Sequence, residues 1–154
     1  MLDLKQPELY INRELSLVEF NKRVLALAED ETIPLLERLL YLCISSTNLD
    51  EFFEVRVSGL IQMVELGAVQ TGPDNMKPAE VLSAISTRVH ALVDDQYRVL
   101  NDVILPLLQT EGVRTIKRTQ WTTAQEAWLS EYFEEELSPV LSPLGLDPAH
   151  PFPR

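Results

Sequence analysis

Apolar residues recur at intervals of three and four along most of the chain, and strand-like alternation is nearly absent, so the pattern predicts a mainly α protein. A first helix is expected to begin at an S-x-x-E capping box formed by Ser16 and Glu19. Its apolar face, formed by Phe20, Val24 and Leu27, continues as far as the acidic run 29–31, which we interpret as a capped, solvated connection rather than a metal site.

A second helix is predicted to begin near Pro34 and to continue to Leu66, where Gly67 supplies a stop signal. A turn-rich linker follows at residues 71–78. The third helix has an apolar face at three-four spacing that only Gln96 interrupts, and Pro106 is expected to kink or end it. The apolar residues of that face are Leu82, Ile85, Val89, Leu92, Val99 and Val103.

Three antiparallel helices with short connections predict a three-helix, spectrin-repeat-like bundle over residues 16–109. The pattern then changes, because residues 113–117 alternate like a strand, a helix is expected from a capping box at Thr123 and Glu126, and the tail 138–154 is rich in proline. We therefore expect a bundle domain at 1–111 and, at 112–154, the opening strand and helix of an incomplete α/β domain.

The second predicted helix is apolar on two sides. Its main face is assigned to the bundle core and holds Leu35, Leu36, Leu39, Leu42, Cys43, Phe53, Val57, Leu60, Ile61 and Val64. The opposite face holds Tyr41, Ile44, Phe52 and Val55, a set we call the second stripe. Because a small bundle needs only one apolar face on each helix, the second stripe is expected to be exposed in this chain and to dock on another surface.

Asn48 lies within the second stripe and has two interpretations. As one of four consecutive residues, 45–48, that compete for backbone hydrogen bonds, it is a capping or kink residue, the reading that the residues alone favour. Alternatively, its amide offers a donor beside an acceptor and pairs with a base such as adenine. The neighbouring Asp50 and Glu51 point about 100° apart and are expected to pair with Arg56 or face solvent.

Composition narrows the function classes. The 154 residues carry 13 Lys and Arg against 24 Asp and Glu, a net charge of −11 that disfavours binding to nucleic acid, polyphosphate or an anionic membrane. One cysteine, Cys43, permits no internal disulfide, and neither a signal sequence nor a membrane span is evident, so a cytoplasmic protein is expected. His90 and His150 have no nucleophile or metal partner at a diagnostic spacing, and no complete active site is expected.

Four segments, residues 9–16, 20–25, 46–56 and 143–153, resemble the N-terminal region of the long, four-domain bacterial polyphosphate kinases. The most specific runs are NLDEF at 48–52 and DPAHPFP at 147–153. The resemblance implies the N-terminal domain and the start of the head domain of an enzyme that moves the γ-phosphoryl group of ATP onto a histidine and then onto polyphosphate, with magnesium. It further implies that Asn48 lines the adenine end of the nucleotide site, and that the phosphorylated histidine and the magnesium ligands lie in domains outside these residues.

We therefore expect this chain to be an N-terminal domain that is inactive alone, docks on the other domains and belongs to a homo-oligomer. The alternative is a free-standing helical scaffold whose second stripe binds a helix of another protein.

Overall fold

The structure is a computed structural model that describes residues 6–145, which form helices and connecting segments without a β-strand. The chain divides into two compact units, with the first ending at Arg114 and the second beginning at Thr115. Within the described residues, no helix combines the length and the apolar character needed to cross a membrane.

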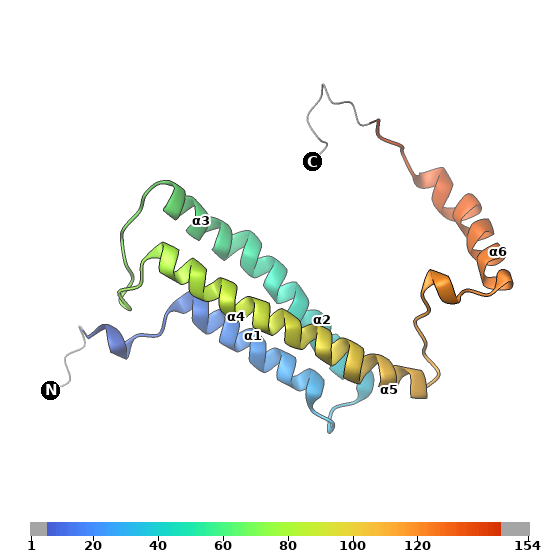
Figure 1. Cartoon of the computed structure of the whole chain (residues 1–154), viewed down its shortest axis with the longest axis horizontal. Helices are drawn as coiled ribbons and strands as arrows, with labels where there is room; N and C mark the ends of the chain where they lie inside the picture. The colour runs from blue at the N-terminus through green and yellow to red at the C-terminus, as the bar shows by residue number, and fades with distance from the viewer. Residues whose placement is uncertain (1–5, 146–154) are drawn as a thin grey trace. The chain divides into compact units, whose positions relative to one another are not determined.

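The first unit is the three-helix bundle predicted from the hydrophobic spacing (Figure 1). One helix is α1, Arg13–Glu29. The second is continuous through α2, Leu35–Glu51, the π-helical stretch η2, Phe52–Val57, and α3, Ser58–Glu65. The third combines α4, Pro78–Arg98, the π-helical stretch η3, Val99–Ile104, and α5, Leu105–Thr110.

The N-terminus of α1 differs from the sequence prediction. Asn12 caps the helix, because its Oδ1 accepts hydrogen bonds of 3.1 Å from the backbone N–H groups of Glu14 and Leu15. The predicted cap, Ser16, lies one turn inside the helix and donates its own backbone N–H to the carbonyl of Asn12. The helix therefore begins earlier than predicted.

The end of the second long helix confirms the predicted glycine stop. Gly67 has a φ of +69°, a left-handed conformation that glycine adopts without steric cost. Its N–H bonds the carbonyl of Val64 at 3.0 Å, and the next N–H, of Ala68, bonds Met63 at 2.9 Å. This pair of bonds satisfies carbonyls that the helix end would otherwise leave free.

Pro106 does not end the third helix, which continues to Thr110. The π-helical stretch η3 directly precedes it, and Leu105 closes that stretch by donating its N–H to the carbonyl of Leu100, five residues back. A wider turn at this point gives room for a proline ring that cannot join the hydrogen-bond ladder. Of the two expectations for Pro106, an end to the helix is wrong, and the departure from α-helical geometry lies in the turn before it.

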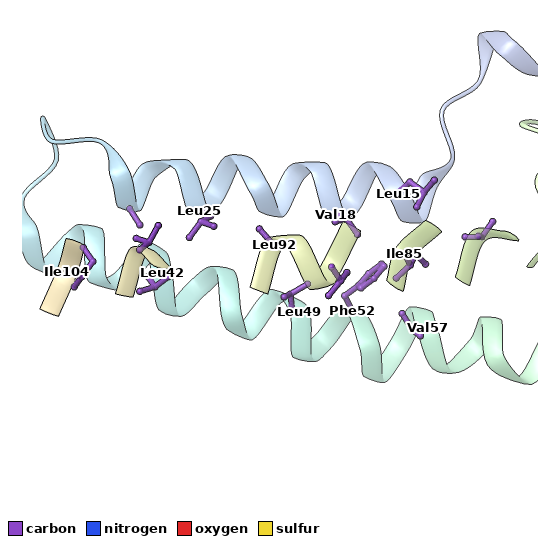
Figure 2. Close-up of a cluster of buried hydrophobic side chains, with 14 of the residues drawn as sticks. Leu15, Val18, Leu25, Leu42, Leu49, Phe52, Val57, Ile85, Leu92 and Ile104 are labelled. Atoms are coloured by element: carbon purple, nitrogen blue, oxygen red, sulfur yellow. The ribbon is translucent and has the colours of Figure 1, made fainter. Parts of the chain in front are cut away.

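The core lies between the three long helices (Figure 2). Ile85, Val99 and Ile104 are almost fully buried, and Leu42 and Val57 join them as the sequence predicted. Other residues of the predicted core face are exposed instead. Those corrections are Leu36, Cys43, Phe53, Ile61 and Val64.

The register of the second long helix explains these corrections. Its buried positions on α2 include two polar residues, Arg38 and Ser45, which a search for an apolar face excludes. In η2 the buried positions Phe52 and Val57 are five residues apart, because a π-helical turn accommodates one more residue than an α-helical turn. A constant 100° per residue therefore misplaces the faces of this helix.

In the second unit, α6 spans Thr123–Tyr132 and continues through η5, Phe133–Leu137. Its capping box lies one residue earlier than predicted, because Thr122 Oγ1 accepts from the N–H of Gln125 at 3.3 Å. The predicted strand at 113–117 is not formed. A strand needs a paired neighbour, and the described residues supply none. The tail predictions at 146–154, including His150, lie outside the described residues.

Candidate functional site

A layer of amide and hydroxyl side chains crosses the middle of the bundle. It joins Asn21 on α1, Ser45 and Asn48 on α2, and Gln96 on α4. Asn21, Ser45 and Gln96 are buried, and Asn48 is half-buried. Buried polar groups require partners, and each of these side chains has one within the layer.

The hydrogen bonds of the layer form a chain. Asn21 Nδ2 donates to the backbone carbonyl of Ser45 at 2.8 Å, and Asn48 Nδ2 donates to Asn21 Oδ1 at 3.2 Å. Gln96 Nε2 donates to Ser45 Oγ at 2.8 Å. The chain links the three helices and fixes the half-buried amide of Asn48 through a buried partner.

A cavity of about 270 Å³ opens beside Asn48, between α1 and the second long helix. Most of its lining is apolar, with a few polar groups, the composition typical of a small-molecule site. One wall includes Phe20, whose ring has the Arg23 guanidinium 5.7 Å from its centroid. The lining residues are Leu17, Val18, Phe20, Asn21, Asn48, Leu49, Glu51, Phe52, Val55 and Arg56.

The chemistry available in the cavity comes mainly from Asn48. One of its two N–H bonds is committed to Asn21, which leaves one N–H donor and the Oδ1 acceptor. Glu51 and Arg56 add one charge of each sign. An apolar cavity with one amide edge suits a flat heterocycle that carries both a donor and an acceptor.

Asn48 does not act as a cap or kink residue of its own helix. Its side chain bonds across to α1, and the residues around it within α2 are regular α-helix. The neighbouring Thr47 does compete for backbone, because its Oγ1 donates to the carbonyl of Cys43 at 3.1 Å. Of these two residues, the side chain of Thr47 therefore bonds the backbone of its own helix, and that of Asn48 does not.

The second stripe is only partly exposed. Ile44 and Val55 are 37% and 61% exposed, as predicted. Phe52, at 8%, is buried in the core, and Tyr41 packs against the core half-buried. The prediction of exposure is therefore wrong for Phe52 and Tyr41, which belong to the bundle itself.

The structure also tests the predicted ion pair of Arg56 and the role of His90. The ion pairs found among residues 6–145 join Arg88 to Glu19 and Arg98 to Glu29 and Asp95, so Arg56 does not form the predicted pair. His90 is exposed, with Nδ1 2.7 Å from the carbonyl of Ser86, one turn back on the same helix. That contact gives it a local structural role.

Sequence reasoning missed Asn21 as a site residue. The predicted apolar face of α1 is wrong, because Phe20 and Leu27 are exposed. A signal was present, because Val18, Asn21 and Leu25 follow the three-four spacing of the core face of α1. A polar residue at a core position needs a specific partner, but the sequence alone does not identify that partner on another helix.

Comparison with known proteins places these features in a family. Residues 10–116 match the polyphosphate kinase N-terminal domain, and residues 124–154 match the polyphosphate kinase middle domain. The polyphosphate kinase of Pseudomonas syringae pv. tomato is 50% identical over 151 residues, which cover 98% of this chain and 20% of that protein. That of Xylella fastidiosa strain Temecula1 is 52% identical over 150 residues, with 97% and 21% covered.

A solved structure agrees with the fold. The crystal structure of polyphosphate kinase from Porphyromonas gingivalis matches with a TM-score of 0.70 and 32% identity, over 84% of this chain and 18% of that one. The chain thus spans about a fifth of the length of the relatives it matches. With a family domain matched over residues 10–116 and a bundle shared with a solved relative, the chain belongs to the polyphosphate kinase family.

Proposed function

We propose that this chain is the N-terminal part of an ATP:polyphosphate phosphotransferase and that it forms the adenine end of the ATP site. Asn48 is the nucleotide-binding residue. The observation that carries the proposal is the half-buried Asn48 amide on the wall of an otherwise apolar cavity. The family match supplies the reaction in which such a cavity has a use.

The cavity offers what an adenine ring requires. Its apolar and aromatic lining favours transfer of a flat, weakly polar ring out of water. The amide edge of Asn48 matches adenine, which presents an amino donor beside a ring-nitrogen acceptor. Arg56, at the same cavity, is the nearby cation that an anionic nucleotide would favour.

The remaining parts of the reaction are assigned outside this chain. Phosphoryl transfer to a histidine and then to polyphosphate needs concentrated positive charge, whereas this chain has a net charge of −11. The described residues contain no group of three His, Cys, Asp or Glu side chains that fits magnesium, so no step here is assigned to that metal.

We also propose that Ile44 and Val55 dock on the other domains of a cytoplasmic homo-oligomer.

The test is Asn48→Ala in a polyphosphate kinase that carries this chain as its N-terminal part. Loss of one neutral hydrogen-bonding pair costs about 0.5–1.5 kcal/mol, so KM for ATP should rise roughly two- to twelvefold with kcat little changed. Thr47→Ala is the matched control, because Thr47 is the adjacent residue, is exposed and bonds only its own helix. An unchanged KM in Asn48→Ala, with a lowered melting temperature, would refute the proposal.

A further inference from the structure

We infer that Asn21 is a positioning residue that holds the Asn48 amide in one of its two orientations. It thereby fixes where the Oδ1 acceptor of Asn48 lies in the cavity and selects a base with an amino group at its 6-position. The inference rests on the proposed function of Asn48. It adds a second residue, on another helix, and a direction of specificity. The structural basis is the hydrogen-bond chain that runs from the Ser45 carbonyl through Asn21 to Asn48.

The first step is the orientation of Asn21. A backbone carbonyl can only accept, so the group of Asn21 that lies 2.8 Å from the Ser45 oxygen must be the amide nitrogen. Turning the Asn21 amide over would place two acceptor oxygens against each other. Asn21 is only 3% exposed, so water is not available to relieve such a contact. Its Oδ1 is therefore fixed toward Asn48.

The second step transfers that direction to Asn48. Because Asn21 presents an acceptor, Asn48 must present its Nδ2 group, which it does at 3.2 Å. The Oδ1 of Asn48 is then the atom left without a partner in the layer, together with one N–H. A half-buried amide that rotated freely would offer either edge to a ligand, whereas this one is held in a single orientation.

The third step is the consequence for the base. An Oδ1 acceptor pairs with the 6-amino group of adenine, and the remaining N–H pairs with an adjacent ring nitrogen. Guanine and hypoxanthine carry a carbonyl at that position, so acceptor would meet acceptor in a cavity that is mostly apolar. The fixed amide therefore discriminates by rejecting the wrong group as well as by binding the right one.

The support of the chain is rigid. Ser45 is fully buried within a regular helix, and its hydroxyl is held by Gln96 from α4 at 2.8 Å. The Gln96 bond reaches the Ser45 side chain, whereas Asn21 binds the Ser45 backbone. This separation provides a control, because Gln96 can be changed without removing any bond that orients Asn48.

The experiment compares two variants of Asn21 in a polyphosphate kinase that carries this chain. Asn21→Leu removes the acceptor that faces Asn48. Asn21→Asp keeps an acceptor there whether its carboxyl is charged or neutral, although burial makes it destabilising. We expect Asn21→Leu to lower the ratio of kcat/KM for ATP to that for GTP by about two- to tenfold, the size of one neutral hydrogen bond, with kcat for ATP little changed.

Asn21→Asp should preserve the nucleotide ratio even where its melting temperature falls as far as that of Asn21→Leu. Gln96→Leu should lower the melting temperature and leave the ratio unchanged. In an Asn48→Ala background, Asn21→Leu should have no further effect on the ratio, since Asn21 acts through Asn48. A ratio that falls equally in Asn21→Leu and Gln96→Leu, or additively with Asn48→Ala, would overturn the inference.

A ligand series tests the same point in the unmodified kinase, which removes any dependence on how the variants fold. Purine riboside triphosphate, which has hydrogen at the 6-position, should have a KM about two- to tenfold above that of ATP, and inosine triphosphate a KM higher still. Equal KM values for the three nucleotides would overturn the inference. Failure of the proposed function is distinct, because Asn48→Ala would then leave the KM for ATP unchanged.

Discussion

The side chain of Arg38, near the start of α2, donates from Nε to the backbone carbonyl of Ala28, in the last turn of α1, at 2.8 Å. Arg38 is only 5% exposed, and no carboxylate pairs with it among the described residues. The guanidinium instead satisfies a carbonyl that the end of α1 leaves free and places a positive charge at the negative end of the helix dipole. This contact holds the first hairpin of the bundle.

Replacing Arg38 should therefore destabilise the bundle. Arg38→Met keeps most of the side-chain volume but removes a buried, charge-assisted hydrogen bond, so the free energy of unfolding should fall by about 1.5–3 kcal/mol. Arg88→Met removes a 3.1 Å ion pair to Glu19 between exposed side chains and should cost about 0–1 kcal/mol. Urea denaturation of the two variants gives the comparison, and equal losses would contradict the role assigned to Arg38.

The connection after α1 should respond to acid through Asp30. The Thr32 hydroxyl, 2.7 Å from Asp30 Oδ1, and then the Thr32 N–H, at 2.9 Å, hold the pKa of this carboxyl below its ordinary 3.8, and the charge of Arg38 adds to the effect. A lowered folded-state pKa stabilises the fold above the unfolded-state pKa, and this stabilisation is lost as pH falls through the folded-state pKa.

Asp30→Asn isolates this contribution, because its Oδ1 still accepts from Thr32 but carries no charge. The stability difference between the original chain and Asp30→Asn should be constant above about pH 5 and shrink below about pH 4. Thermal melts of both proteins from pH 6 to 2.5 measure the difference. A difference that does not change with pH would show that Asp30 has no such role.

By itself, the chain should neither synthesise polyphosphate nor hydrolyse ATP. Its net charge of −11 is opposite in sign to what transfer between two polyanions requires, and His90 is held against its own helix. An ATP-consumption assay and a polyphosphate dye assay on the purified chain check this, with a complete family member as the positive control. Phosphohistidine or polyphosphate in the purified sample would contradict the assignment of catalysis to other domains.

The sequence was sufficient for the features that depend on local patterns. Three-four spacing predicted the three-helix bundle, and Gly67 marked the end of the second long helix where a left-handed residue is required. For Asn48 the residues alone favoured a capping or kink role, and the resemblance to the polyphosphate kinases made it the candidate nucleotide-binding residue. Its assignment to nucleotide binding remains a prediction.

The features that sequence reasoning missed depend on contacts between helices. Arg38 and Ser45 occupy core positions because partners on α1 and α4 satisfy them, and a search for apolar faces places such residues on the outside. Asn21 is paired with residues 24 and 27 positions away. Phe52 continues the buried face of α2 and Phe53 is exposed, the reverse of the prediction, and η2 then places the next buried residue, Val57, five positions after Phe52.

The register shift itself can be tested by deleting one residue. Removing Glu54, an exposed residue within η2, would leave Phe52 and Val57 four positions apart and turn the π-helical stretch into ordinary α-helix. Both ends of the long helix would then keep their buried faces. The free energy of unfolding should change by less than about 1 kcal/mol, because the deletion removes an exposed residue and leaves the core contacts in place.

Deletion of Ser46 is the matched control, because it removes an exposed residue from the regular part of the same helix. It rotates everything that follows by about 100° and turns Leu49 and Phe52 away from the core, at a cost of about 1.5–3 kcal/mol for each side chain exposed. Urea denaturation compares the two deletions. Equal destabilisation would show that the π-helical turn does not set the register.

Deletion of Glu54 also separates the effect of η2 on stability from its effect on nucleotide binding. Val55 and Arg56 line the cavity from within η2, and closing the π-helical turn rotates both relative to Asn48. In a polyphosphate kinase that carries this chain, deletion of Glu54 should therefore raise KM for ATP although the bundle stays folded. Because π-helical turns occur frequently at functional sites, an unchanged KM would mean that η2 serves packing alone.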